Sequence, residues 1–314
     1  MRKTFLAFVL TVLTFAAHAQ NMFEYSDISR GLFAQKSVSG VRSMNDGEHY
    51  TAVKEGRIEK YSYKTGHLAG VLFDSKSVEG FGDRLSTYEL RADEKKILLS
   101  KDRRPIYRRS ATADYYIYDI SSKAIHKLTQ DGREQEATFS PDGSRVAFVR
   151  GNNIYYVELS DYSLQTVTAD GLFNNIINGH TDWVYEEEFG FTRAFEFSPD
   201  GQKIAYLRFD ESEVREYTMM YFRDRLYPEP YKFKYPLAGE KNSEVTLYVY
   251  DIRSNGATKL DTGSETDQYI PRIGWTPEGE LYFYRTNRLQ NHFELLVADN
   301  ACGSKVAYVE KDKC

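Results

Sequence analysis

Turns that contain Pro-Asp-Gly, or a related acidic turn, recur along this chain, and each is followed by a short strand-like run. The two clearest copies cover residues 139–149 and 197–207, and weaker copies lie at 44–47, 90–94 and 275–279. In such a turn proline presets φ, the aspartate hydrogen-bonds the turn and the glycine tolerates positive φ. The repeat therefore predicts a chain built from similar β units.

A second pattern follows most of these turns, namely a β-prone run that ends in an acid and an aliphatic residue. Its copies lie at 114–120, 153–159 and 246–252, and the strand-favouring residue tyrosine occurs 25 times in the chain. The interval between turns is 47 residues from Asp46 to Asp93 and 49 residues from Asp93 to Asp142. Repeats of this length that hold several short strands are typical of β-propeller blades.

The later intervals are longer, at 58 residues from Asp142 to Asp200 and 78 residues from there to Glu278. They predict insertions at about 172–196 and 210–243. Insertions in a repeat array map to loops, often on the binding face. The second insertion is rich in aromatic residues and proline, and it is either an arm that packs on a partner or a plain long loop.

The fold class predicted by these patterns is all-β, with a leading segment over 20–41 and a partial β-propeller of about four to five blades over 42–314. A propeller closes only where its last blade meets its first, since otherwise strand edges stay open. Five blades can close, but the sequence carries no closing signal after the last strand-like run at 305–310. We therefore expect an incomplete propeller.

The first 19 residues resemble a secretory signal peptide. A basic start, Met1-Arg2-Lys3, precedes an apolar run from Thr4 to Ala17 and the small-residue cleavage pattern Ala17-His18-Ala19. The apolar run is short for a bilayer span, although a retained anchor is the alternative reading. We expect export to the periplasm, the cell envelope or the medium.

Charge and cysteine usage exclude several functions. The net charge of −5 gives no electrostatic reason to expect a nucleic-acid partner. The two cysteines, Cys302 and Cys314, are candidates for a disulfide, which export permits, or partners of cysteines outside this sequence. Two thiols do not make a metal site, and we expect neither a metal nor a cofactor.

An acidic and aromatic run near the middle of the chain is the candidate binding site. Three glutamates follow large rings, in the order Asp182, Trp183, Val184, Tyr185, Glu186, Glu187 and Glu188. Adjacent carboxylates repel one another, and a solvated acidic loop does not need such rings. A pocket that receives an ammonium group would use both, because converging carboxylates can accept its N–H donors. The alternative is an ordinary wet surface loop.

Catalytic motifs are missing from the sequence. It contains no Gly-x-Ser-x-Gly nucleophile elbow, no Walker-type loop, no His-Glu-x-x-His and no Cys-x-x-Cys. His180 is better explained as a loop residue than as a general base. We therefore expect no catalytic residue in this chain, and a recognition site instead.

Three stretches together resemble the dipeptidyl peptidase IV family of exported serine peptidases. Residues 178–188 are similar to its double-Glu motif, residues 107–110 leading into 116–119 are similar to its substrate-contacting Arg segment, and residues 235–242 are similar to its Tyr-Pro-x-Ala-Gly-x-x-Asn run. The resemblance extends from about Leu32 to the end of the chain.

The resemblance implies an eight-bladed propeller followed by an α/β-hydrolase domain with a Ser-Asp-His triad, and that domain is missing here. It implies that Glu187 and Glu188 clamp the free α-amine of a peptide and that Arg108 contacts the first carbonyl. Substrates would carry Pro, or less well Ala, second from the amino terminus, and a homodimer is also implied. The residues taken as supporting the site are Asp182, Trp183, Tyr185, Glu186 and Arg109.

Two functions remain open at this point. The chain is either the amino-terminal recognition part of an exported dipeptidyl peptidase, inactive by itself, or a free-standing propeller that captures peptide amino termini without hydrolysing them. A purely structural surface propeller is the weakest alternative, because it leaves the acidic stretch unexplained.

Overall fold

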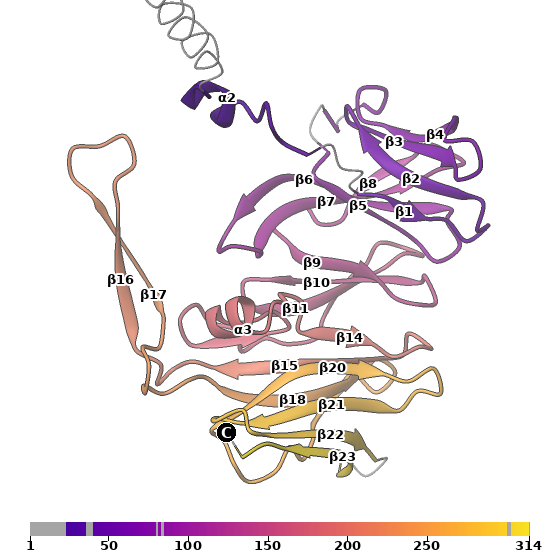
Figure 1. Cartoon of the computed structure of the whole chain (residues 1–314). Helices are drawn as coiled ribbons and strands as arrows, with labels where there is room; N and C mark the ends of the chain where they lie inside the picture. Colours follow the sequence, from indigo (N-terminus) through magenta and orange to yellow (C-terminus); the bar gives the residue numbers. More distant parts are fainter. Residues whose placement is uncertain (1–22, 36–39, 80, 83–84, 300–302, 314) are drawn as a thin grey trace, which may run out of the picture.

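Five antiparallel sheets, stacked one after another in chain order, make up the body of the protein (Figure 1). The computed structural model describes residues 23–35, 40–79, 81–82, 85–299 and 303–313. The predicted signal peptide at 1–19 and the disulfide candidates Cys302 and Cys314 lie outside these residues. A short helix, α2 (Tyr25–Ser29), occupies the leading segment ahead of the first sheet.

The first three sheets have four strands each, paired in chain order. The first consists of β1 (Arg42–Ser43), β2 (His49–Lys54), β3 (Arg57–Ser62) and β4 (Leu68–Asp74). The second consists of β5 (Thr87–Leu90), β6 (Lys96–Pro105), β7 (Ala111–Asp119) and β8 (Ile125–Lys127). The third consists of β9 (Gln135–Phe139), β10 (Arg145–Arg150), β11 (Asn153–Glu158) and β12 (Leu164–Thr166).

The fourth sheet differs because its first strand is split in two. Both β13 (Ile176–Asn178) and β14 (Phe195–Phe197) pair with β15 (Lys203–Asp210), at opposite ends of that strand. The sheet continues through β18 (Glu244–Asp251) and β19 (Gly256–Lys259). Between β13 and β14 the chain leaves the sheet and forms the helix α3 (Trp183–Glu188). The first predicted insertion contains this excursion.

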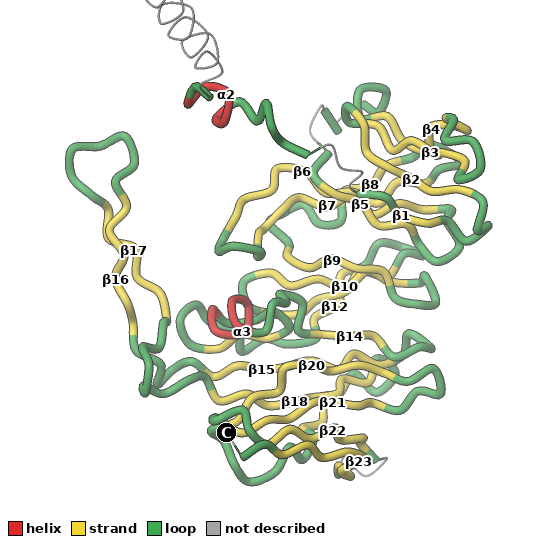
Figure 2. Tube along the Cα trace, in the orientation of Figure 1, coloured by secondary structure: helices red, strands yellow, loops and turns green. Residues whose placement is uncertain are grey.

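The fifth sheet contains β20 (Gln268–Trp275), β21 (Leu281–Asn287), β22 (His292–Ala298) and β23 (Ser304–Lys311). The second predicted insertion contains a separate hairpin of β16 (Glu216–Tyr221) and β17 (Glu229–Lys234), which projects from the body as an arm (Figures 1 and 2). All of the strand pairings in the described residues are antiparallel. The prediction of an all-β, partial propeller is confirmed, and five sheets correspond to the upper end of the expected count.

The core lies between neighbouring sheets, and the strand β10 shows why its sequence is apolar at four successive positions. Val146 and Phe148 point into the cluster shared with the second sheet, whereas Ala147 and Val149 point into the cluster shared with the fourth. All four side chains are fully buried. Alternate residues of a strand face opposite sides, so a sheet packed on both faces needs an unbroken apolar run.

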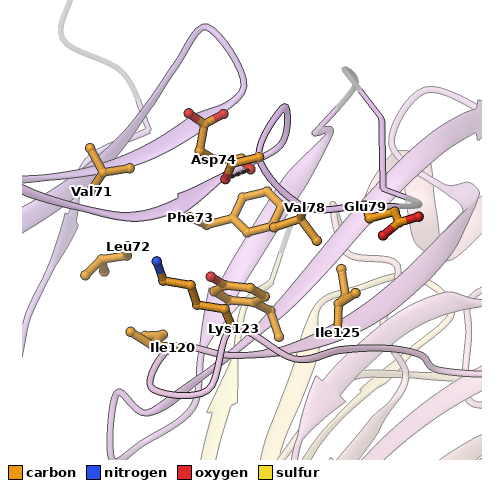
Figure 3. Close-up of a pocket in the computed structure, with 11 residues that line it drawn as sticks. Val71, Leu72, Phe73, Asp74, Val78, Glu79, Ile120, Lys123 and Ile125 are labelled. Carbon is orange, nitrogen blue, oxygen red and sulfur yellow. Dashed lines mark hydrogen bonds between the residues drawn. The ribbon is translucent and has the colours of Figure 1, made fainter.

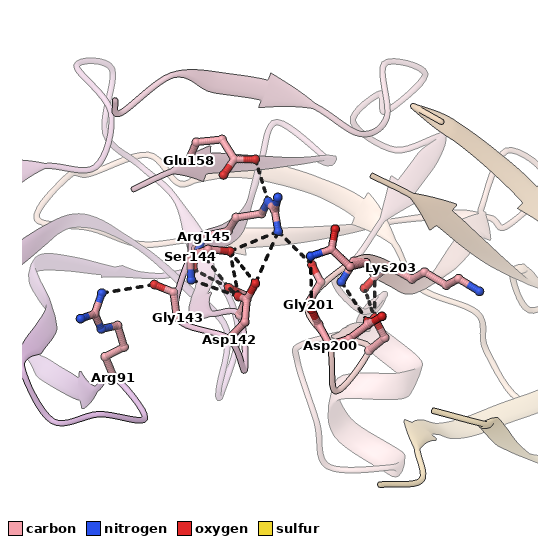
Figure 4. Close-up of polar contacts among 12 residues, drawn as sticks. Arg91, Asp142, Gly143, Ser144, Arg145, Glu158, Asp200, Gly201 and Lys203 are labelled. Carbon is pink, nitrogen blue, oxygen red and sulfur yellow. Dashed lines mark hydrogen bonds and ion pairs between the residues drawn. The ribbon is translucent and has the colours of Figure 1, made fainter. Parts of the chain in front are cut away.

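The Pro-Asp-Gly turns also link adjacent sheets to each other (Figure 4). Nη1 of Arg91 donates to the carbonyl oxygen of Gly143 at 3.3 Å, and Nη1 of Arg145 donates to that of Gly201 at 3.1 Å. Gly143 has a φ of +70°, and an added Cβ would lie 2.9 Å from the Arg91 side chain. The same glycine that permits the turn therefore also permits the contact between blades.

Candidate functional site

The helix α3 presents the three glutamates, and its start is fixed by Asp182. The Asp182 carboxylate accepts the backbone N–H of Tyr185 at 2.9 Å and the hydroxyl of Ser243 at 2.7 Å. Aspartate is a favoured N-cap because it satisfies a backbone donor that the first turn leaves free. Burial raises the pKa of Asp182, and these two hydrogen bonds oppose that shift.

Tyr185 anchors the helix to the core beneath it. Its side chain is 1% exposed, its ring packs edge-on against Phe209, and its hydroxyl accepts the backbone N–H of Ile270 at 2.8 Å. This contact joins the helix to the first strand of the fifth sheet. The large ring next to the glutamates is thus part of the frame that holds them.

Gly179 allows the chain to leave the sheet just before the helix. Its φ is +77°, and an added Cβ would lie 2.5 Å from Ile154. The backbone N–H of Ala194 donates to the carbonyl oxygen of Gly179 at 2.9 Å, which closes the excursion where the chain returns to the sheet. A side chain at position 179 would therefore clash with Ile154 of the third sheet and strain the backbone at this φ.

The three glutamates point in different directions, since successive residues of a helix are separated by about 100°. Glu186 is completely buried, Glu187 has a side chain that is 15% exposed, and Glu188 is exposed. Within the described residues, the Glu188 carboxylate has no hydrogen bond or ion pair to the protein. It is therefore available to a ligand that approaches from solvent.

Arg108 and Glu187 are brought together across 79 residues of sequence. Nε of Arg108 lies 2.7 Å from Oε2 of Glu187, and Nη1 of Arg109 lies 3.9 Å from the same oxygen. The Arg108 side chain is 72% exposed. An exposed guanidinium next to a carboxylate offers N–H donors for a carbonyl oxygen and an acceptor for an ammonium group.

Glu186 fixes the distance between these two elements. One of its oxygens, Oε1, accepts the backbone N–H groups of Arg109 at 2.6 Å and Ser110 at 2.9 Å, and its own carbonyl oxygen accepts Nη1 of Arg109 at 3.0 Å. Charge-assisted bonds of this kind are strong when buried. The sequence analysis placed Glu186 only as a supporting residue. It did not identify Arg109 and Ser110 as its partners, because they lie 77 and 76 residues before it in the sequence.

The remaining supporting residue, Trp183, begins the helix and packs against Tyr235, with ring centroids 4.2 Å apart. Both ring nitrogens of His180 are occupied by contacts within the protein. Its ring nitrogens lie 3.0 Å from the Thr181 carbonyl oxygen and 3.0 Å from Asn152, and burial lowers its pKa to about 4.

A pocket of about 530 Å³ lies between the outer parts of the first two sheets (Figure 3). Its lining combines the apolar side chains of Phe73, Val78, Ile120 and Ile125 with the charged side chains of Asp74, Glu79 and Lys123. None of the predicted site residues lines it.

The described residues hold no cluster of three or more side chains suited to a metal ion. No helix found there is both long and apolar enough to cross a membrane.

Residues 91–313 match the family model described as the dipeptidyl peptidase IV N-terminal region. A probable dipeptidyl-aminopeptidase B from Aspergillus oryzae is 31% identical over 303 residues, which is 90% of this chain and 33% of that protein. A probable dipeptidyl peptidase 4 from Emericella nidulans is 30% identical over 88% of this chain and 36% of its own length.

Among solved structures, the crystal structure of Porphyromonas gingivalis dipeptidyl peptidase 4 is similar, with a TM-score of 0.89 and 38% sequence identity. The match covers 94% of this chain and 43% of that one. The chain thus spans about a third of the length of the curated relatives and less than half of this structural relative.

Proposed function

We propose a function from the premise that this chain belongs to the dipeptidyl peptidase IV family. In this proposal the chain forms the part of an exported serine peptidase that recognises a peptide's free amino terminus. The peptidase would release Xaa-Pro or Xaa-Ala dipeptides. The proposal rests on the placement of Arg108 beside Glu187, and on the Glu188 carboxylate, which makes no bond to the described part of the chain.

The chemistry of such a site follows from its charges. The carboxylates of Glu187 and Glu188 would accept the N–H donors of an ammonium group, while Arg108 would donate to the first carbonyl oxygen. An acylated or interior nitrogen carries no positive charge and would leave these carboxylates without a partner. By holding the free amine, the site would place the peptide bond that follows the second residue next to a nucleophile in another domain.

Hydrolysis itself would come from a separate α/β-hydrolase domain, because the sequence contains no nucleophile elbow. We expect the 314-residue chain alone to leave a Gly-Pro chromogenic amide intact. Turnover that survived rigorous removal of host peptidases would contradict this.

The test of the proposed function uses the propeller joined to a family-like hydrolase domain. Glu187→Gln and Glu188→Gln each remove one charge-assisted bond to the ammonium, and we expect kcat/KM on the Gly-Pro amide to fall roughly 30- to 1000-fold, or about 2–4 kcal/mol. Arg108→Ala should also lower kcat/KM. Glu186→Gln should cost much less, because it keeps an oxygen for the backbone N–H groups of Arg109 and Ser110 and we assign it no contact with the ligand. If neither Glu187→Gln nor Glu188→Gln mattered, the stretch would be an ordinary solvated loop.

The second candidate, a free-standing propeller that binds peptide amino termini, uses the same residues. It predicts peptide binding without any hydrolytic partner in the cell. The reading frame just downstream of Cys314 separates the two, since a Gly-x-Ser-x-Gly motif followed by a later histidine would favour the peptidase.

A further inference from the structure

The root of the β16–β17 hairpin contacts both halves of the candidate amine site. The ring of Phe233 lies 5.8 Å from that of Tyr107, the residue before Arg108. The ring of Tyr235 lies 4.2 Å from that of Trp183, the first residue of α3. Phe233 and Tyr235 also contact each other, with centroids 5.9 Å apart. One short segment thus links the loop that carries Arg108 to the helix that carries the glutamates.

The hairpin has a buried root and an exposed tip. Phe233 is 3% exposed, whereas Phe222 is 72% and Leu226 is 86% exposed. The two strands pair with each other and not with any of the five sheets. Their position relative to the body therefore depends on contacts at the root, which include the bonds from Nζ of Lys234 to the carbonyl oxygens of Val214 at 2.6 Å and Ser212 at 3.1 Å.

We infer that Phe233 and Tyr235 are positioning residues of the amine site, which act through Tyr107 and Trp183 to hold Arg108 and the α3 glutamates at a fixed separation. This inference rests on the proposed function. A peptide whose ammonium binds the α3 glutamates while its first carbonyl oxygen accepts from Arg108 requires both elements to be in register. Loss of either ring leaves a cavity against Tyr107 or Trp183, and the element beside it can then shift.

A consequence is energetic coupling between the arm and the site. A peptide that fixes the Arg108 loop and α3 also orders the hairpin root. By linkage, a second ligand that orders the root strengthens peptide binding by the factor by which the peptide strengthens the binding of that ligand. The position of the exposed tip would then change when a peptide binds, although the tip does not contact the peptide.

The sequence supplies its own reporter for a test. It has two tryptophans, Trp183 at the site and Trp275 in β20. In a Trp275→Phe background the fluorescence of the whole 314-residue chain reports on Trp183 alone. The probe is Gly-Pro-amide, titrated at the lowest protein concentration that the signal allows, with near-ultraviolet circular dichroism as the folding check.

We expect Phe233→Ala and Tyr235→Ala each to weaken Gly-Pro-amide binding roughly 3- to 10-fold, in line with the loss of one aromatic contact. Tyr235→Phe keeps the ring and should restore the affinity of the parent. Phe222→Ala, at the exposed tip of the same hairpin, is the matched control and should bind like the parent. If Phe233→Ala loses the folded spectrum, Phe233→Leu takes its place, with a smaller loss expected.

Two results would overturn the inference and are distinguishable from failure of the proposed function. If the root variants bound like the parent while Glu188→Gln lost binding, the root would have no positioning role and the clamp would stand. If Phe222→Ala weakened binding as much as Phe233→Ala, the effect would come from the whole arm rather than from its root. If Glu188→Gln and the parent bound equally, the proposed function itself would be wrong.

Discussion

Glu186 differs from the two glutamates that follow it because its bonds go to the protein. Its buried Oε1 satisfies two backbone N–H groups of the loop at 109–110, which belongs to the second sheet's central hairpin. Leaving a buried donor unpaired costs about 1–3 kcal/mol. The first glutamate of the triplet is therefore expected to act on structure, and the next two on ligand.

Substitution separates these roles. Glu186→Ala should lower the free energy of unfolding by about 2–4 kcal/mol, because it strands both N–H groups, whereas Glu186→Gln keeps an amide oxygen for them and should lose less. Glu188→Ala is the matched control, since its exposed side chain makes no bond to the described part of the protein. Urea unfolding followed by circular dichroism measures all three. Equal stability of Glu186→Ala and the parent would remove the structural role.

At the scale of secondary-structure elements, the junction between β15 and the arm contains Glu211, a carboxyl group whose pKa is raised. Burial raises the pKa of Glu211 to about 8, with repulsion from Asp182 and Asp210 adding to the shift and Lys234 opposing it. The folded state then holds this proton more tightly than the unfolded chain does. Its contribution to stability is complete below the ordinary glutamate pKa and declines as the pH rises toward about 8.

The prediction for Glu211 has a defined sign. The free energy of unfolding should fall between about pH 5 and pH 8, and Glu211→Gln should flatten that slope, since each unit of pKa shift corresponds to about 1.4 kcal/mol. Glu213→Gln, at an exposed position two residues further along the chain, is the control and should keep the slope. Urea unfolding at several pH values measures the effect. A parent whose stability rose across this range would contradict it.

The turns and sheets could be predicted from sequence because their signals are local. Pro-Asp-Gly specifies its own turn, and β10 carries its two-faced burial in four successive apolar residues. The helix α3 was not predicted. It has six residues, too few for a helical period, and it depends on the Asp182 cap and on the burial of Tyr185. The available signal was Asp182 itself, a favoured N-cap residue directly before the run at 183–188.

The hairpin and the inner contacts of the site lay beyond sequence reasoning for a different reason. The second insertion could be recognised by its length, yet an arm and a loop could not be distinguished. The arm is positioned by rings at 107 and 183, far away in the sequence. Likewise, the assignment of Glu187, Glu188 and Arg108 came from resemblance, and the amine-binding role of these residues remains a prediction.

At the scale of the whole molecule, the outward faces of the first and fifth sheets both carry clusters of aromatic rings. The first carries ring contacts between Tyr50 and both Tyr61 and Tyr63. The fifth carries contacts of Tyr284 with Tyr282 and Phe293, and its last strand exposes Tyr308. Such aromatic faces and open strand edges favour association with other protein surfaces.

We therefore expect the isolated chain to self-associate and to unfold over a broad temperature range. Scanning calorimetry at two protein concentrations, together with light scattering, measures both properties. A monodisperse monomer with a single sharp transition would instead indicate a closed small propeller whose end faces are covered.

We propose that Glu187 and Glu188 of α3, together with Arg108, bind a free amino terminus. The most direct measurement is calorimetric titration of the 314-residue chain with Gly-Pro-amide and with its N-acetylated form, side by side. We predict saturable binding of the free amine and a loss of roughly 30-fold or more on acetylation, since the ammonium and its charge-assisted bonds disappear. Equal binding of the two peptides, or binding of neither by a folded chain, would contradict it.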